Sequence, residues 1–131
     1  MTTPVESVRH FYDALGRGDV PVILSLLDAQ VEWTEAERFP YYSGTWYGPQ
    51  AVLDNLLVPL SAEWDGFSVT PHELIAEGDR VVALGSYSGR FKKTGRSFSA
   101  AFAHVWTARG GKLVRFDMHT DTAKVLEATQ G

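Results

Sequence analysis

Residues 96–120 read RSFSAAFAHVWTARGGKLVRFDMHT, and this segment decides the fold. Apolar and polar side chains alternate on both sides of 108–112, the pattern of two antiparallel strands joined by a tight turn. The same period of two begins upstream at Phe67 and is interrupted by turn residues at 77–80 and 92–96. We therefore expect a meander of four antiparallel strands over 67–77, 80–91, 96–107 and 112–120.

The first half of the chain has the period of amphipathic helices. Apolar residues recur at three- and four-residue steps from Val5 to Leu15, and Gly16 and Gly18 then stop the helix. Three helices, a strand and a curved meander predict an α+β fold, in which helices cover one face of the sheet. Outside the meander we expect a helix near 4–16, a second helix capped by Asp19, and a third that begins at Pro49 and that Pro59 ends or bends. We also expect a strand at 31–35, a loop over 38–48 and a last short helix at 122–129.

Length and composition restrict the class of protein. The 131 residues are enough for one domain, 1–131, and 44% hydrophobic residues can supply its core. A net charge of −4 without a basic run argues against nucleic acid and anionic membrane surfaces as partners. The chain has no cysteine and no long apolar segment, so we expect a cytoplasmic protein with no membrane span.

The last hairpin determines which residues share a face, and two registers are open. A two-residue turn at Arg109-Gly110 pairs His104 with Arg115, which places Asp117, His119 and Asp121 on the His104 face. A three-residue turn at 109–111 pairs His104 with Phe116 instead. We favour the second register because it gathers the apolar side chains on one face, namely Phe98, Ala100, Phe102, His104 and Trp106 with Phe116, Met118 and Thr120.

Four short motifs are spread over nearly the whole chain. They are FYDALGRGD at 11–19, VEW at 31–33, GPQAV at 48–52, and GKLVRF at 111–116 leading to Asp121. With these motifs the chain resembles the SnoaL-like, ketosteroid isomerase-like branch of the nuclear transport factor 2 superfamily. The resemblance implies a cone-shaped sheet around an apolar pocket plugged by N-terminal helices, and a homodimer.

The resemblance also shows what this chain lacks. Ketosteroid isomerases move a proton with an Asp base and stabilise the enolate with a Tyr and a protonated Asp. Those positions correspond here to Trp33, Phe11 and His104 respectively. Because tryptophan cannot abstract a proton, steroid isomerisation by the usual residues is not expected.

Three residues are candidates for the chemistry, each with a structural alternative. His104 can act as a general acid or base or as a donor to a ligand carbonyl, or it can be a hydrogen-bonded core histidine. Glu35, two residues after Trp33, can be a base at the pocket mouth or an exposed strand-end glutamate. Asp121 corresponds to an acidic residue that works on substrate or water in the related hydrolases and cyclases, or it caps the last helix.

The remaining side chains of the expected pocket are aromatic or apolar. The aromatic loop at 39–47 can close over the pocket or simply pack against it. The alternate residues Asp117, His119 and Asp121 are only a weak indication of a metal site, and we interpret them as a polar stripe, so we expect no metal. The sequence has no phosphate-binding or nucleotide-binding motif, so we expect no cofactor. The expected ligand-binding residues are Phe11, Trp33, Tyr42, Trp46, Phe102, Trp106, Phe116 and Met118.

Two functions remain open from the sequence. The first is an enzyme of proton transfer (isomerase, cyclase, dehydratase or hydrolase) acting on an apolar cyclic or polyketide-like molecule. The second is a non-catalytic protein that binds an apolar ligand or assembles as a dimer. A carboxylate or tyrosine beside the ring of His104 would favour the enzyme, because proton transfer between two substrate atoms needs a base and an electrophile.

Overall fold

The computed structural model describes residues 2–130, and its elements follow the expected order of helices and then strands. The helices and strands run in the order α1 Pro4–Arg17, α2 Val20–Leu26, β1 Leu27–Thr34, β2 Thr45–Tyr47, α3 Pro49–Val52, the π-helical segment η1 Leu53–Leu57, α4 Val58–Glu63, β3 Trp64–Glu77, β4 Arg80–Phe91, β5 Ser97–Arg109, β6 Lys112–Thr120 and α5 Thr122–Thr129.

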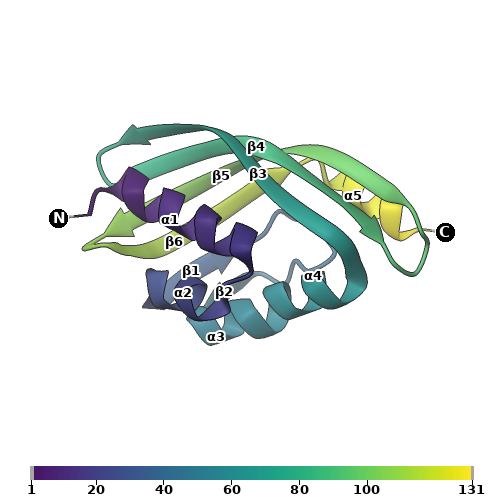
Figure 1. Cartoon of the computed structure of the whole chain (residues 1–131), viewed down its shortest axis with the longest axis horizontal. Coiled ribbons are helices and arrows are strands. Elements are labelled where there is room, and N and C mark those ends of the chain that lie inside the picture. The colour runs from purple at the N-terminus through teal and green to yellow at the C-terminus, as the bar shows by residue number, and fades with distance from the viewer. Residues whose placement is uncertain (1, 131) are drawn as a thin grey trace.

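One six-stranded sheet forms the body of the protein, with strand order β2-β1-β6-β5-β4-β3. The pairs are antiparallel except β1 with β6, which are parallel. In Figure 1 the long strands β3 to β6 curve over α1 to α4, while α5 lies at the end of the molecule opposite the N-terminus. The α+β prediction is confirmed, and the sheet is strongly curved and open.

Helix α1 begins and ends where its sequence signals predict. Thr3 accepts a hydrogen bond from the backbone N–H of Glu6, and the Glu6 carboxylate accepts one from the N–H of Thr3, which is a capping box. Gly18 ends the helix in the left-handed conformation at φ 66°. These caps fix the axis of α1, so that Phe11 and Tyr12 lie buried against the sheet.

Two local predictions in the middle of the chain need correction. Of the two outcomes expected at Pro59, an end of the helix is wrong: helical structure continues through Pro59 to Glu63, after a wider π turn in which the N–H of Val58 bonds back to the carbonyl of Leu53. The expected loop over 38–48 contains a short strand, β2, in which Trp46 pairs with Trp33. Three residues are too few for alternation to be recognised, so the sequence does not predict this strand.

The last hairpin adopts neither of the two expected registers. Gly110 and Gly111 form a two-residue turn with φ of 57° and 77°, a conformation that favours glycine at both positions. A register shift at Thr107/Ala108 then pairs His104 with Met118, not with Phe116. The difference is two residues, which preserves alternation, so the apolar side chains share one face as the favoured register predicted.

Most buried side chains lie between the concave face of the sheet and the helices, and the buried polar side chains include His104 and Glu35. No helix among residues 2–130 is long and apolar enough to cross a membrane.

Candidate functional site

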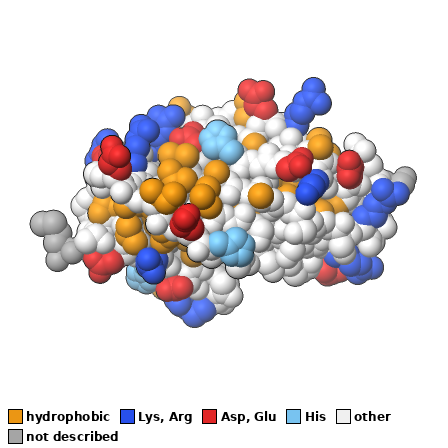
Figure 2. Space-filling model, turned by 90° about the horizontal axis from the view of Figure 1, so that it is seen from above, with side chains coloured by type: hydrophobic (Ala, Val, Ile, Leu, Met, Phe, Trp, Pro, Cys, Tyr) orange, Lys and Arg blue, Asp and Glu red, His pale blue; other side chains and the backbone are white. Residues whose placement is uncertain are grey.

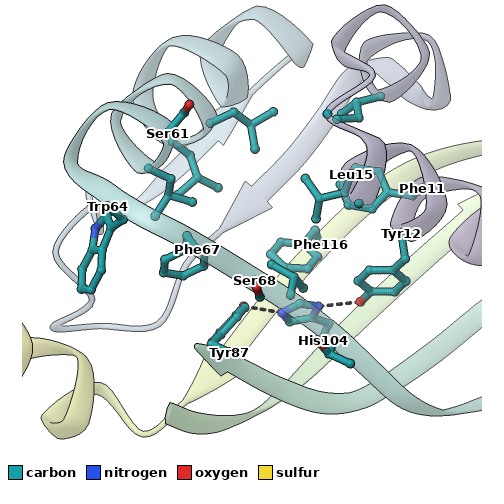
Figure 3. A pocket seen from close by; sticks show the side chains of 18 of the residues that line it. Phe11, Tyr12, Leu15, Ser61, Trp64, Phe67, Ser68, Tyr87, His104 and Phe116 are labelled. Atoms are coloured by element: carbon teal, nitrogen blue, oxygen red, sulfur yellow. Dashed lines mark hydrogen bonds between the residues drawn. The ribbon is translucent and has the colours of Figure 1, made fainter. Parts of the chain in front are cut away.

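A cavity of about 660 Å³ lies between the sheet and helices α1, α2 and the η1–α4 segment. Figure 3 shows aromatic side chains from α1, β3, β4, β5 and β6 around it. Its size suits a small organic molecule. The residues that line it are Phe11, Tyr12, Leu15, Gly16, Gly18, Val20, Ile23, Trp33, Glu35, Phe39, Leu56, Leu57, Leu60, Ser61, Trp64, Gly66, Phe67, Ser68, Val69, Thr70, Tyr87, His104, Trp106 and Phe116.

His104 lies at the wall of this cavity with both ring nitrogens occupied. The Nδ1 atom is 2.5 Å from the hydroxyl oxygen of Tyr12, and Nε2 contacts the hydroxyl of Tyr87. Figure 3 shows the two tyrosines on opposite sides of the imidazole. The ring of Phe102 stacks on the imidazole with centroids 3.9 Å apart. The imidazole therefore has no nitrogen left for a ligand.

Trp106 extends this arrangement into a chain of four polar groups. Its indole Nε1–H donates to the Tyr12 oxygen over 2.9 Å. All four side chains are buried: Trp106, Tyr12, His104 and Tyr87. We call these four residues the tyrosine–imidazole chain.

The close packing of Phe102 against His104 depends on a glycine in the neighbouring strand. Gly85 pairs with Phe102, and a Cβ at Gly85 would lie 2.5 Å from the Phe102 ring and 2.2 Å from the carbonyl oxygen of Thr70. The missing side chain lets the aromatic ring lie under β4 and against the imidazole.

Burial determines the charge of His104. Desolvation lowers its pKa well below the ordinary value, and the charge of nearby His119 lowers it further. Burial also raises the pKa of both tyrosines above their ordinary value. At neutral pH the tyrosine–imidazole chain is therefore uncharged.

Glu35 is the second buried ionisable group at the cavity. It follows the last residue of β1 and is only 5% exposed, so it is not the exposed strand-end glutamate of the structural alternative. Its Oε2 atom is buried without a hydrogen-bond partner. Burial raises the pKa of this carboxyl group to about 8, against an opposing effect of the nearby Trp33 side chain. Glu35 can thus exist as acid or base near neutral pH.

Trp33 and Tyr87 supply polar hydrogens at the same cavity. The buried Nε1 of Trp33 has no hydrogen-bond partner, so the indole lies near Glu35 without bonding to it. Burial raises the pKa of Tyr87, and the charge of Glu35 raises it further. A carboxyl group and two donors, from β1 and β4, therefore share one aromatic cavity.

The structure brings together only part of the set expected to bind a ligand. Phe11, Trp33, Trp106 and Phe116 line the cavity. Phe102 and Met118 are buried beside His104 without lining the cavity, and Tyr42 and Trp46 are not among its lining residues either.

Asp121 is placed away from the cavity lining. Its carboxylate accepts a hydrogen bond from the N–H of Lys124 and caps α5, which is the structural alternative. Asp117 forms an ion pair with Arg115 at 2.9 Å on the outer side of β6. Residues 2–130 contain no group of three His, Asp or Glu side chains placed to hold a metal ion.

Sequence reasoning missed the two tyrosines that contact His104. Tyr87 alternates with the buried residues Val81, Ala83 and Gly85 on β4, a signal that could have placed it inside. Tyr12 is adjacent to Phe11 on α1, and both residues face the sheet. The family resemblance indicated a tyrosine position on α1 that this chain fills with Phe11. The hydroxyl that α1 provides comes instead from the next residue, Tyr12.

A comparison with protein-family models identifies this architecture. The model of the SnoaL-like domain matches residues 8–116, which include Tyr12, Trp33, Glu35, Tyr87 and His104. The chain belongs to the SnoaL-like family. The expected resemblance is thereby confirmed, together with a fold that proteins of this family use to bind small molecules.

Solved structures of similar proteins match this chain over all or nearly all of its length. An NTF2-like protein from Burkholderia thailandensis E264 is 37% identical over 100% of both chains, with a TM-score of 0.96. One from Burkholderia pseudomallei K96243 is 29% identical over 100% of both chains, with a TM-score of 0.89. TerC, co-crystallised with polyporic acid, is 27% identical over 98% of both chains, with a TM-score of 0.86. No curated protein matches this SnoaL-like chain significantly.

Proposed function

We propose that this SnoaL-like protein binds an apolar cyclic molecule and transfers a proton on it, with Glu35 as the acid or base. The observation that supports this is the buried carboxyl group of Glu35, whose Oε2 atom has no partner at the wall of an aromatic cavity. A buried polar atom without a partner is rare in folded proteins, and a ligand group would satisfy it.

The electrostatics of Glu35 fit this role. Its pKa of about 8 allows the carboxyl group to be protonated or ionised near neutral pH, which general acid–base catalysis requires. The hydroxyl of Tyr87 and the indole N–H of Trp33 are uncharged donors at the same cavity. They would stabilise the negative charge that develops on a ligand oxygen when a neighbouring carbon loses its proton.

His104 takes a different role from the one expected of it. Because both ring nitrogens already have tyrosine partners, we assign His104 to positioning Tyr87, and not to exchanging protons with a ligand. The cavity then has one titrating group, Glu35, beside an uncharged chain of donors.

A relative supports the binding of a small molecule. TerC, which shares 27% of its residues with this chain, was crystallised with polyporic acid. The rival function, binding without catalysis, is favoured by Trp33, which stands where related isomerases have their base. The two functions differ in whether the bound molecule exchanges protons.

Solvent deuterium exchange tests the proposal directly. Cyclic ketones and enones that raise the melting temperature of the protein are incubated with it in D₂O, and NMR measures deuterium at the carbon next to the carbonyl. We expect exchange above the buffer rate, reduced about 100-fold or more by Glu35→Gln. Glu37→Gln changes an exposed carboxylate two residues away and should have no effect.

The result decides between the two functions. Ligands that bind without exchanging deuterium would establish the non-catalytic alternative. Exchange that survives in Glu35→Gln would remove Glu35 from the mechanism. A panel without any binding member would contradict the proposed ligand class.

We also propose that the outer face of the sheet pairs with a second copy of the chain. Figure 2 shows hydrophobic side chains gathered on the face seen from above, and Ile75 and Leu84 on β3 and β4 are 52% and 37% exposed. Sedimentation should show a dimer that Leu84→Glu dissociates, and a monomeric wild type would contradict this. A cytoplasmic location stays a prediction.

A further inference from the structure

The connection between β1 and β2 contains most of the aromatic loop whose role the sequence left open. It spans residues 35–44, beside α4 in Figure 1, and begins with Glu35, the proposed acid or base. The N–H of Phe39 bonds to the carbonyl of Ala36 over 3.1 Å, and this turn brings Phe39 back to the cavity that Glu35 lines. Phe39 and Glu35 are only 4% and 5% exposed. We call residues 36–44 the cover segment.

The mouth of the cavity lies at other residues. Exposed residues of its lining come from the connection between α1 and α2 and from the first half of β3, among them Gly16, Gly18, Gly66, Ser68 and Thr70. Glu35 is nearly inaccessible although the cavity itself is open, so its immediate surroundings keep it from water. A carboxyl group at the start of a surface connection stays in that state only while the connection stays closed.

Among residues 2–130, one side chain of the cover segment forms hydrogen bonds to another element. The hydroxyl of Tyr41 donates to Oε1 of Glu63 over 2.6 Å and accepts from the Nε1–H of Trp64 over 2.9 Å. Glu63 ends α4 and Trp64 begins β3, so both bonds hold the segment at the junction of these two elements. The backbone hydrogen bonds of the segment stay within it, so Tyr41 is its polar attachment.

The backbone of the cover segment needs such contacts to keep its conformation. Arg38 has a φ of 70°, and among residues 2–130 it is the only residue other than glycine in the left-handed region. This conformation is unfavourable for a residue with a side chain, so the surrounding contacts must hold it. The contacts next to Arg38 are those of Phe39 at the cavity and of Tyr41 at α4.

We propose that the cover segment keeps water away from Glu35, with Phe39 as its plug and the hydroxyl of Tyr41 as its latch. This inference rests on the proposed function and concerns the surroundings of its acid or base. Tyr41 does not line the cavity, so it acts as a positioning residue. Opening of the segment lets water reach Glu35 and favours its ionised form, so the strength of the latch limits how far the carboxyl group resists ionisation.

Titration of Glu35 in two neighbouring tyrosine variants is the first test. Tyr41→Phe removes the hydroxyl that forms both hydrogen bonds, whereas Tyr42→Phe makes the same change at a 40% exposed neighbour. NMR of the glutamate side-chain carboxyl carbons gives the midpoint of Glu35. We expect Tyr41→Phe to lower this midpoint by about one pH unit, the equivalent of one hydrogen bond to a carboxylate, and Tyr42→Phe to leave it unchanged.

The charges around Glu35 stay the same in this comparison, so a lowered midpoint reports the entry of water. Tyrosine and phenylalanine are both uncharged at neutral pH. The charged residues of the segment and of its attachment are present in both variants, namely Glu37, Arg38 and Glu63. The other ionisable side chains that line the cavity are uncharged at neutral pH, namely Tyr12, Tyr87 and His104.

Hydrogen exchange is the second test, and it measures opening without reference to Glu35. The N–H groups of Phe39 and Tyr42 donate the backbone hydrogen bonds inside the cover segment, so their exchange reports its opening. We expect both amides to exchange about tenfold faster in Tyr41→Phe, with the amides of β5 unchanged. Glu63→Gln should also speed their exchange. Combined with Tyr41→Phe it should add nothing, because both substitutions break the same hydrogen bond.

The outcomes separate this inference from the proposed function. A midpoint or an exchange rate that Tyr41→Phe leaves unchanged, an equal shift in Tyr42→Phe, or additive effects of Tyr41→Phe and Glu63→Gln overturns the latch. If Tyr41→Phe lowers the midpoint while no cyclic ketone exchanges deuterium, the cover stands and only the proton transfer fails. If ketones exchange deuterium through Glu35 while Tyr41→Phe leaves its midpoint unchanged, only the latch fails. A wild-type midpoint near 4.5 overturns both.

Discussion

His104 and Glu35 are both buried at the same cavity, yet their surroundings are opposite. Each ring nitrogen of His104 has a tyrosine partner, and the chain continues to Trp106. One carboxyl oxygen of Glu35 has no hydrogen-bond partner, and the indole nitrogen of the nearby Trp33 has none either. A buried polar group with all its partners stabilises the fold, whereas one without a partner is available to a ligand.

The largest expected effect comes from breaking the satisfied region. His104→Ala removes a buried ring and leaves the hydroxyls of Tyr12 and Tyr87 short of a partner, so we expect unfolding free energy to fall by about 3 kcal/mol or more. Glu35→Gln at pH 7 replaces a neutral carboxyl group by a neutral amide of similar shape, and we expect a change within about 1 kcal/mol. Urea denaturation measures both, and equal losses would contradict the comparison.

The dependence of stability on pH should distinguish the two residues by sign. The folded pKa of Glu35 is raised from 4.5 to about 8, so the folded state holds a proton that the unfolded state has lost. Stability should therefore fall as pH rises from 4.5 to about 8, by up to about 1.4 kcal/mol per pH unit. The folded pKa of His104 is lowered from 6.5, so its contribution is present above pH 6.5 and is lost as pH falls.

The two contributions oppose each other most strongly below pH 6.5. Above pH 6.5 the unfolded His104 loses its remaining proton, so its contribution fades towards pH 8, while that of Glu35 persists. Urea denaturation from pH 6.5 to 8 should show a falling stability in the wild type and no fall in Glu35→Gln. A wild type that is flat from pH 6.5 to 8 would show that the Glu35 carboxyl group is solvated.

A smaller effect compares one substitution at two tryptophans. Trp106→Phe removes an N–H that donates to Tyr12, whereas Trp33→Phe removes an N–H without a partner. Both substitutions lose similar apolar surface, so we expect Trp106→Phe to destabilise the protein by about 1 kcal/mol more, the value of one hydrogen bond. Thermal denaturation of the two variants checks this, and the reverse order would contradict the contrast between the regions.

Periodicity predicted the α+β order of helices and strands, and together with the family resemblance it placed His104 in the pocket. Alternation along β5 places His104, Trp106 and Phe102 on one face, and a two-residue error in hairpin register keeps that face unchanged. The bulge at Thr107 and the turn at 110–111 depend on backbone conformation, which two consecutive glycines allow in more than one way.

The hydrogen-bond partners of the buried polar groups could not be predicted from the sequence. Tyr12 and Tyr87 are separated from His104 by 92 and 17 positions, and only the curvature of the sheet brings all three together. Glu35 lies beyond the end of β1, where alternation no longer indicates direction. The sequence therefore identified both buried groups as candidates, but it ranked His104 first because partner counts depend on tertiary contacts.

Titration of Glu35 tests the central claim most directly. NMR of protein carrying ¹³C at the side-chain carboxyl carbons of glutamate follows each one across pH, and the signal absent from Glu35→Gln identifies Glu35. The account predicts a midpoint for Glu35 near the pKa of about 8 that burial produces. A midpoint near the ordinary glutamate pKa of 4.5 would show a solvated carboxylate, and the proposed acid or base would be lost.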